Sequence, residues 1–288
     1  MTSVAIVGNG SKAKVREAAG EVRDWLSGRA ENPLFDLEGR ADLSSLEADV
    51  LLVFGGDGSI LSAARRLNGR PVPVMGVNFG KVGFIAEYNL DEIRGALESV
   101  FAGEAVASSR MMLEIASPAG SGMAGRALND VVILRGANPR MIYIELTLDG
   151  ERKLQYAGDG LVVSTPTGST AHSLTAGGPI LTPEMKGVVL TPICAQALTT
   201  RPLVIPADTQ LEIRVQMEGP SGTLTLDGQT CCEIGDGDVL RVEARPDAFR
   251  LLRAPGRGFL GILKEKLSWG VLPLYRERFR DEGGSAPD

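Results

Sequence analysis

The most informative feature of the sequence is the pentapeptide Gly-Gly-Asp-Gly-Ser at residues 55–59, whose residue types suit phosphate chemistry. It follows the apolar run Val50–Phe54 and precedes a helix-forming stretch at residues 60–67. A strand that turns through glycines into a helix presents free backbone N–H groups at the positive end of the helix dipole, which attracts anions. The pattern therefore predicts a phosphate-binding turn.

Asp57 suggests that this turn does more than bind phosphate. An acidic side chain beside a polyphosphate is electrostatically unfavourable unless it has a task, such as accepting a proton from an attacking hydroxyl or helping to hold Mg²⁺. The motif therefore points to phosphoryl transfer. A purely structural alternative is that the glycines form a tight turn and Asp57 caps the following helix.

The composition narrows the class of protein and its partners. Of the 288 residues, 43% are hydrophobic and 23% are charged, which is ordinary for a soluble protein of one or two domains. The net charge of −6 offers no general attraction to nucleic acid or to an anionic membrane, so a phosphate ligand must be held locally. The sequence shows neither a bilayer-spanning apolar run nor a signal peptide, which favours a cytoplasmic protein.

The cysteine and histidine content argues against several chemistries. Cys194, Cys231 and Cys232 are odd in number and two are adjacent, which suits neither a disulfide framework nor the paired spacing of zinc sites. His172 is the only histidine, so a His-based metal site or a Ser-His-Asp hydrolase has little to work with. Any bound metal is therefore expected to be Mg²⁺, or another divalent cation, on oxygen ligands.

The elements that must position the phosphate-binding turn begin with an α/β region. Residues 1–106 alternate apolar strands with helices, which predicts a Rossmann-like domain with a parallel sheet. Ser11 is the expected N-cap of the first helix. Ligands of such sheets bind beyond the carboxyl ends of the strands, where residues 55–59 would lie. The strands are expected at residues 4–7, 50–54 and 73–78, and the helices at 12–26, 60–67 and 90–101.

The rest of the chain has a different sequence pattern. Residues 107–254 contain short period-two runs separated by turn residues, including a predicted hairpin turn at Asp149-Gly150, and are expected to form a β-sandwich domain. Residues 255–288 include an amphipathic helix at 259–267 that is predicted to pack back on the first domain. The expected fold class is α/β plus all-β. The strands are expected at residues 112–116, 126–134, 141–148, 153–156, 160–164, 210–217, 223–227 and 239–244.

A second chemically dense segment runs from residue 158 to residue 182 and is rich in Gly, Ser and Thr. It lies between two apolar strands and offers hydroxyls and backbone donors where the chain can approach a ligand closely, which suits a nucleotide. Residues 169–176 are predicted to open a short helix whose N-terminus faces phosphate or ribose. The alternative is an irregular surface loop rich in turn-forming residues.

Taken together, these motifs resemble those of the NAD kinase family in order and approximate spacing. The first motif is shared with diacylglycerol-type lipid kinases and phosphofructokinases, whereas Thr-Pro-Thr-Gly-Ser-Thr-Ala at residues 165–171 is highly specific. The resemblance implies a C-terminal β domain that binds NAD, a site between the two domains and a homodimer or homotetramer. The matching motifs are residues 55–59, 129–130, 158–160, 165–173, 177–179, 227–229 and 267–270.

The family's reaction transfers a phosphoryl group from ATP, or in some members polyphosphate, to the 2′-hydroxyl of the adenosine ribose of NAD, giving NADP. The resemblance makes Asp57 the catalytic carboxylate that orients or deprotonates this hydroxyl. Gly55, Gly56 and Gly58 would let backbone amides approach the phosphates. Elementary chemistry agrees, because a ribose hydroxyl is a poor nucleophile at neutral pH and is assisted by a positioned base together with charge neutralisation by Mg²⁺.

The resemblance also implies ligand contacts. Asn129 and Asp130 are implied to hydrogen-bond ribose hydroxyls, and Asp159 to lie by the nicotinamide end of NAD. Arg140 and Gln229 are implied to contact the substrate. As an alternative, each of these residues could be an ordinary turn or loop residue.

The adenine and ribose pocket is implied to be lined by the segment at residues 170–175. His172 stands where the family most often has Tyr, and because both side chains are planar, function is expected to survive with altered affinity. Gln196 stands where members typically carry His, so a titrating role is not expected there. The pocket residues are Thr170, Ala171, His172, Ser173, Leu174 and Thr175.

Two other functions stay open on sequence grounds. A lipid kinase shares the first motif, but it is not expected to carry residues 165–173 in this form. A non-catalytic NAD-binding regulator is permitted by the two departures from the family pattern. Asp57 argues against it, since a protein that only binds the nucleotide has little need for a carboxylate beside phosphates.

Overall fold

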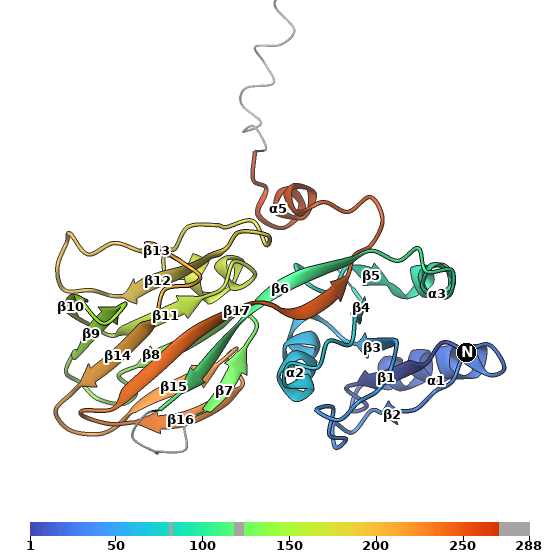
Figure 1. The fold of residues 1–288 in the computed structure, drawn as a ribbon, viewed down its shortest axis with the longest axis horizontal. Helices are drawn as coiled ribbons and strands as arrows, with labels where there is room; N and C mark the ends of the chain where they lie inside the picture. Colours follow the sequence, from blue (N-terminus) through green and yellow to red (C-terminus); the bar gives the residue numbers. More distant parts are fainter. Residues whose placement is uncertain (81–82, 118–123, 271–288) are drawn as a thin grey trace, which may run out of the picture. The chain divides into compact units, whose positions relative to one another are not determined.

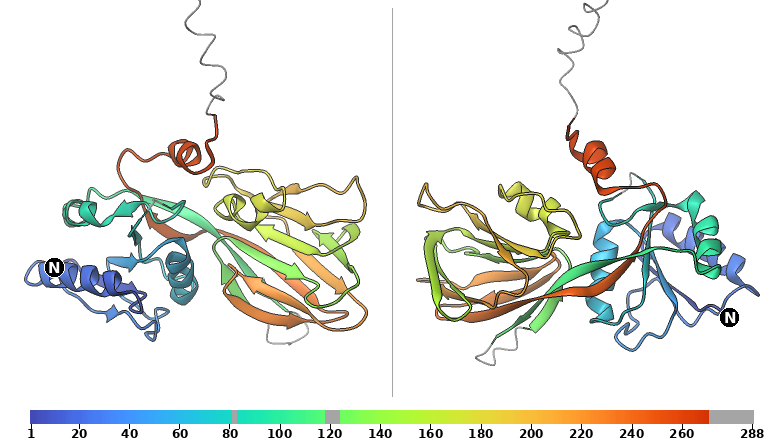
Figure 2. Two further views of the ribbon diagram at one scale, coloured as in Figure 1. Left: turned by 180° about the vertical axis from the view of Figure 1, so that it is seen from behind. Right: turned by 45° about the horizontal axis from the view of Figure 1, so that its top comes forward.

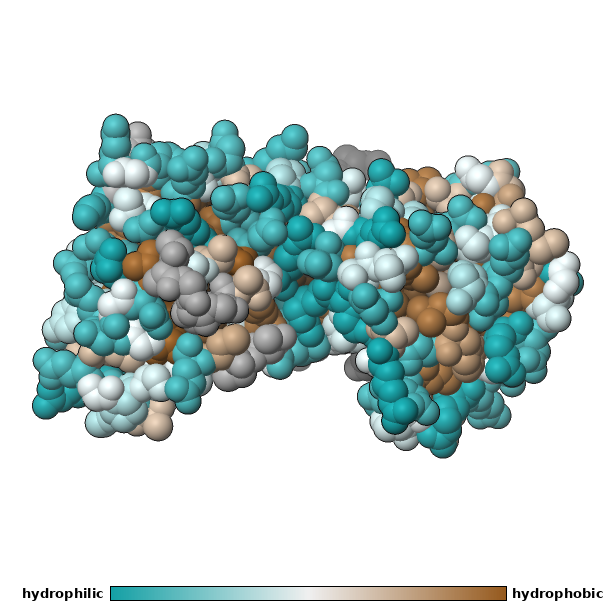
Figure 3. Space-filling view, turned by 60° about the horizontal axis from the view of Figure 1, so that its bottom comes forward, coloured by the Kyte–Doolittle hydropathy of each residue, from teal (hydrophilic) through white to brown (hydrophobic). Residues whose placement is uncertain are grey.

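The computed structural model describes residues 1–80, 83–117 and 124–270 (Figure 1). Met1–Ala254 form one compact unit, and the chain from Pro255 onward forms another. The described part of the first unit is built on an eleven-stranded and a six-stranded sheet. Its surface is mainly hydrophilic on the face shown in Figure 3. None of the described helices is long and apolar enough to cross a membrane.

The first hundred residues form the parallel part of the larger sheet, in which the strands follow the order β5-β4-β3-β1-β2. Side chains alternate across a strand, so Ile6 and Leu52 pack with α1 and α3, whereas Val7 and Val53 pack with α2 on the other face. The strands are β1 (Val4–Gly8), β2 (Phe35–Asp36), β3 (Val50–Phe54), β4 (Val74–Asn78) and β5 (Tyr88–Asn89), and the helices are α1 (Ala13–Leu26), α2 (Asp57–Leu67), η1 (Leu90–Glu92) and α3 (Ile93–Phe101).

Two long antiparallel strands, β6 (Ala107–Ala116) and β17 (Val239–Leu252), run from the parallel part into the C-terminal part (Figure 2). One end of β17 pairs in parallel with β4 through Leu251 and Val74. Its other end pairs antiparallel with β14 through Val242 and Leu211. The two parts of the first unit therefore share one continuous sheet.

The six-stranded sheet, in the order β13-β12-β11-β8-β15-β16, is antiparallel throughout. Ile144 and Val215 of the larger sheet share one apolar core with Leu161 and Leu224 of the smaller sheet, which makes this part a β-sandwich. The remaining strands are β7 (Ala124–Ala127), β8 (Asp130–Leu134), β9 (Ile142–Leu148), β10 (Arg152–Gly158), β11 (Gly160–Ser164), β12 (Gly187–Ile193), β13 (Leu203–Pro206), β14 (Leu211–Gln216), β15 (Gly222–Leu226) and β16 (Thr230–Ile234).

The predicted fold class is confirmed, and several elements match closely. β3 and β11 begin and end at the predicted residues, and so does α5 (Phe259–Leu267) in the second unit. Asp149 and Gly150 have φ angles of 53° and 74° and form the predicted turn of the β9–β10 hairpin. The division at residue 106 and the packing of the last segment on the first domain stay predictions.

Three expectations are wrong in detail. Lys12, not Ser11, is the N-cap of α1, because the Ser11 hydroxyl hydrogen-bonds Asn9 Oδ1 at 2.6 Å instead of a helix amide. The strand expected at residues 126–134 is divided into β7 and β8. The strand expected at 239–244 continues to Leu252 through an irregularity between Arg245 and Phe249.

Candidate functional site

The turn between β3 and α2 has the geometry that its glycines suggest. Gly55 has a φ of 155°, and a Cβ atom at this position would overlap the Ser59 hydroxyl. Gly56 is the N-cap of α2, and Asp57 occupies the first helical turn. The amides of the turn therefore lie at the positive end of the helix dipole, as an anion-binding turn requires.

The Asp57 carboxylate is fixed by a second loop that the sequence did not single out. Its Oδ2 accepts the Phe84 N–H at 2.9 Å, and its Oδ1 accepts the N–H groups of Ile85 and Ala86 at 3.2 and 2.9 Å. A Cβ on Gly83 would overlap the carboxylate. Three backbone donors thus hold Asp57 in one orientation, and only glycine at position 83 allows the approach.

Asn129 and Asp130 lie where β7 gives way to β8, and their backbone is held by Asp227. Asp227 accepts the N–H groups of Leu128 at 3.1 Å, Asn129 at 2.7 Å and Asp130 at 3.2 Å. Asp130 is 4% exposed. Burial, together with the negative charge of Asp227, raises its pKa to about 7, although the backbone N–H of His172 opposes the shift.

Arg65 and Gln229 connect this loop to the helix that carries Asp57. Arg65 on α2 donates to Asp227 Oδ2 at 3.1 Å and also to the side-chain oxygen of Gln229. The Gln229 amide donates in turn to the Gly58 carbonyl at 2.9 Å. Burial raises the pKa of Asp227, and the backbone donors and Arg65 oppose this shift.

The Thr- and Ser-rich segment folds against the same loop. Thr165 donates through its N–H to the Asn129 carbonyl at 2.9 Å and through its hydroxyl to the Leu128 carbonyl at 2.6 Å. A Cβ on Gly168 would overlap the Asn129 carbonyl. The predicted short helix is present as η2 (Gly168–Thr170) and α4 (His172–Thr175), so residues 170–175 adjoin the Asp130 carboxylate through the His172 N–H.

Two polar atoms in this region have unmet hydrogen-bonding demand. The side-chain oxygens of Asn129 and Thr167 are buried and have no partner among the described residues. An unpaired buried polar group costs about 1–3 kcal/mol. Ligand groups that donate hydrogen bonds, such as ribose hydroxyls, would satisfy it.

Asp159 and Arg140 lie at the opposite end of the strand pair. In the pairing of β8 with β11, Asp130 faces Ser164 and Leu134 faces Gly160, so Asp159 lies beyond the far end. Asp159 accepts from Arg135 at 2.8 Å, and Arg140 pairs with Glu218. The structure therefore brings together Asp57, Asn129, Asp130, Gln229 and residues 170–175, but it does not bring Asp159 and Arg140 to them.

A cavity of about 480 Å³ adjoins the phosphate-binding turn. Its lining combines Gly56, Gly58 and two hydroxyls of α2 with Lys12 and Gln229. Arg66 also lines it but is held by Asp36 at 2.8 Å. Burial would raise the pKa of Asp36, yet hydrogen bonds from the Ala41 N–H and Arg66 lower it to about 2.

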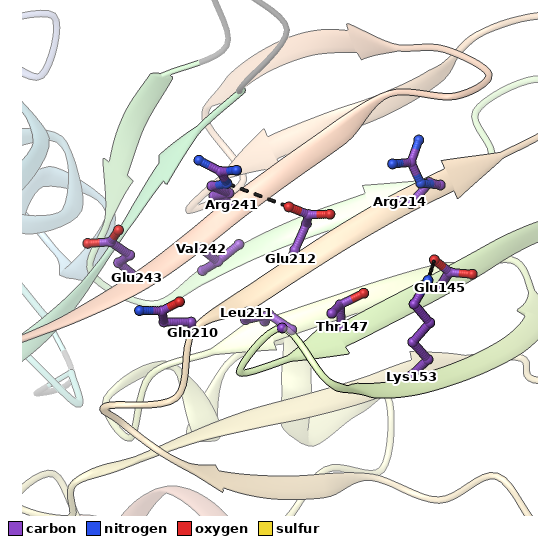
Figure 4. A pocket seen from close by; sticks show the side chains of 11 residues that line it. Glu145, Thr147, Lys153, Gln210, Leu211, Glu212, Arg214, Arg241, Val242 and Glu243 are labelled. Carbon is purple, nitrogen blue, oxygen red and sulfur yellow. Dashed lines mark ion pairs between the residues drawn. The ribbon is translucent and has the colours of Figure 1, made fainter.

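Figure 4 shows another cavity, of about 680 Å³, on the outer face of β9, β14 and β17. Four of its charged side chains pair with one another, with Lys153 3.5 Å from Glu145 and Arg241 3.5 Å from Glu212. None of the predicted site residues lines it. It has the mixed charges of a solvated sheet face, so we do not place the activity there.

An anion-binding turn with a fixed carboxylate, next to buried groups that can accept hydrogen bonds from ribose hydroxyls, defines a nucleotide-dependent phosphotransferase. The comparisons with known families agree. Residues 9–105 match the ATP-NAD kinase N-terminal domain, and residues 128–254 match the ATP-NAD kinase C-terminal domain. The chain belongs to the NAD kinase family.

Curated relatives support this membership, and a solved structure shares the fold. The chain is 38% identical to an NAD kinase of Geobacter metallireducens over 281 residues, covering 94% of this chain and 99% of the relative. It is 40% identical over 248 residues to an NAD kinase of Gemmatimonas aurantiaca, covering 84% and 86%. Yeast NADH kinase, solved with NADH, has a similar fold with a TM-score of 0.83 at 23% identity, covering 94% of this chain and 89% of that one.

Proposed function

We propose that this protein transfers the terminal phosphoryl group of ATP to the 2′-hydroxyl of the adenosine ribose of NAD, giving NADP. The observation that carries the proposal is the junction at Arg65 and Gln229. These side chains hold the helix that bears Asp57 against the loop that bears Asn129 and Asp130. A phosphate site and a ribose site are therefore adjacent on one chain.

In this proposal Asp57 acts as the general base. Its carboxylate accepts or orients the hydroxyl proton while the oxygen attacks phosphorus, and a positioned base of this kind contributes about 10²–10⁴-fold to the rate. The N–H groups of Phe84 and Ala86 keep the carboxylate from rotating. They therefore preorganise it for a hydroxyl that approaches from the Asp130 side.

The donor phosphates are proposed to lie in the cavity beside Gly56 and Gly58, with Lys12 as a counter-charge. A bound Mg²⁺ or other divalent cation would neutralise charge on the phosphates. The described residues contain no cluster of three or more His, Cys, Asp or Glu that would hold a metal alone. The described residues therefore fit a cation held mainly by phosphates and water. Polyphosphate is an alternative donor for the same cavity.

The acceptor is proposed to bind through Asn129, Asp130 and residues 170–175. Asp159 remains a proposed contact for the nicotinamide end of NAD, and Arg140 remains a proposed contact for the substrate. We also propose a homodimer or homotetramer, as the family resemblance implies. The matches to two domain families support a division near residue 106. A cytoplasmic location remains a prediction.

The proposal is tested by measuring NADP formation from NAD and ATP with Mg²⁺, for the wild type and for Asp57→Asn. The wild type is expected to form NADP, and the variant is expected to lose about 10²–10⁴-fold in kcat. ³¹P NMR of the product locates the new phosphate on the 2′-oxygen. The proposal fails if the folded wild type forms no NADP with either ATP or polyphosphate.

A further inference from the structure

The Asp227 carboxylate accepts four hydrogen bonds, yet the proposed reaction gives it no task. Its side chain has no exposed surface, and it accepts three consecutive backbone N–H groups, from Leu128 to Asp130. Such bonds fix the path of the chain at the place where Asn129 and Asp130 must face the acceptor. Asp227 is thus built into the geometry of the acceptor loop without pointing at the ligand.

Arg65 extends this geometry to the catalytic helix. Its guanidinium is 15% exposed and donates both to Asp227 and to Gln229, with Gln229 bonded in turn to Gly58. Gly58 is the residue that follows Asp57. The β15–β16 hairpin turn therefore joins the acceptor loop to the first turn of α2 by a continuous chain of polar contacts. Within this chain, Arg65 and Asp227 are 162 residues apart in sequence.

We propose that Asp227, Arg65 and Gln229 are positioning residues that set the separation between Asp57 and the acceptor loop at residues 128–130. The inference rests on the proposed function, because it concerns the geometry of that transfer. These three residues are therefore expected to affect the rate of the chemical step more than the affinity for NAD or ATP. A displacement of about 1 Å in reacting geometry can lower the rate about 100-fold.

Charge is part of the arrangement. Arg65 is the cation that neutralises Asp227, which lies close enough to raise the pKa of Asp130. When Arg65 is removed, Asp227 loses its counter-charge and its link to α2, so it holds the N–H groups of residues 128–130 less firmly, and Asp130 then faces an uncompensated negative charge. The groups facing Asp130 are the Asp227 carboxylate and the His172 N–H, so its titration reports on the arrangement.

The test compares Arg65→Gln with Arg65→Lys in the full chain. Arg65→Gln is expected to lower kcat about 10- to 100-fold while the KM values for NAD and ATP change less than about threefold. It is also expected to move the pH dependence of kcat/KM to higher pH. Arg65→Lys keeps the charge but not the planar fork and is expected to recover part of the loss. Arg241→Gln, which breaks an ion pair with Glu212 on the outer face of the sandwich, is the matched control.

Hydrogen exchange gives a readout that does not depend on activity. Amides of residues 128–130 are expected to exchange faster in Arg65→Gln than in the wild type and in Arg241→Gln, without ligands. If the wild type forms NADP but Arg65→Gln keeps its kcat, the positioning role is wrong. It is equally wrong if exchange at 128–130 is unchanged, or if the control loses as much kcat. If the wild type forms no NADP, the proposed reaction fails, and hydrogen exchange alone still tests whether Arg65 holds the acceptor loop.

Discussion

The two ends of the strand pair formed by β8 and β11 carry similar residue types in very different environments. At one end, Asp130 is buried beside a second carboxylate, and the Asn129 side-chain oxygen has no partner among the described residues. At the other end, Asp159 is partly exposed and already paired with Arg135. The first end has an unmet demand for hydrogen-bond donors, whereas the second is largely satisfied within the chain.

The difference shows at which predicted ligand residues a bound ligand would offset a free-energy cost. Keeping Asp130 buried beside Asp227 costs free energy, which a ligand with two hydroxyl donors would offset. A partly exposed pair such as Asp159 with Arg135 costs less to rearrange than a buried carboxylate without a counter-charge. We therefore expect large effects at the Asp130 end and small ones at the Asp159 end.

The largest expected effect in this comparison comes from the loop that orients Asp57. Gly83→Ala places a methyl group where the Asp57 carboxylate lies, and the resulting shift is expected to lower kcat about 100-fold. Steady-state kinetics of NADP formation measure it. Gly80→Ala is the matched control, because a Cβ there meets open space. Equal kcat values for the two variants would show that the position of Asp57 does not limit the rate.

The next effect concerns pH. Asp130 has a pKa of about 7, and its ionised form is the better acceptor for ribose hydroxyls. The kcat/KM for NAD is therefore expected to rise about tenfold between pH 6 and pH 8, because about nine-tenths of Asp130 is protonated one unit below its pKa. Asp130→Asn should remove this rise of kcat/KM with pH. If kcat/KM for the variant still rises with pH in the same way, a group other than Asp130 titrates.

The contribution of Asp130 to folding stability should fall with rising pH, whereas kcat/KM should rise. The folded-state pKa of Asp130 lies above the unfolded value, so its favourable contribution is fully present below about pH 4 and is lost as the pH rises through about 7. Asp130→Asn is expected to raise the Tm by a few degrees at pH 8, and by less at pH 5. Calorimetry at the two pH values measures this. A larger gain at pH 5 than at pH 8 would reverse the sign of the argument.

The smallest effect is expected at the distant end. The Arg140 side chain is 71% exposed and pairs with Glu218 at the surface. Arg140→Ala should change the KM for NAD by about twofold at most, since exposed ion pairs contribute little. A tenfold increase in KM would instead show that Arg140 contributes strongly to NAD binding.

Local sequence rules predicted the phosphate-binding turn, whereas the family resemblance implied the acceptor loop. The apolar run Val50–Phe54 and the glycines after it predict a strand and a turn by local rules alone. The support of Asp57 by residues 83–86 is long-range, and the visible signal was only a glycine after β4. Arg65 looked like an ordinary charge on α2, since its partner Asp227 is distant in sequence.

The same limit explains the errors in the fold. β13 and β16 were missed because their runs are short, and cross-strand pairing supplies what the local pattern lacks. β17 passes through Arg-Pro-Asp without ending, because β6 pairs on both sides of the irregularity. Pairing with neighbouring strands therefore determined where these strands form and end more than side-chain periodicity did.

The most direct test of the account compares NAD binding by Asp130→Asn and Asp159→Asn, using titration calorimetry at pH 8, where Asp130 is ionised. The account predicts that Asp130→Asn weakens NAD binding more than tenfold, as expected when a charged hydrogen-bond acceptor is lost. Asp159→Asn should stay within about threefold of the wild type. Strong weakening by Asp159→Asn with little change in Asp130→Asn would contradict the placement of the acceptor site.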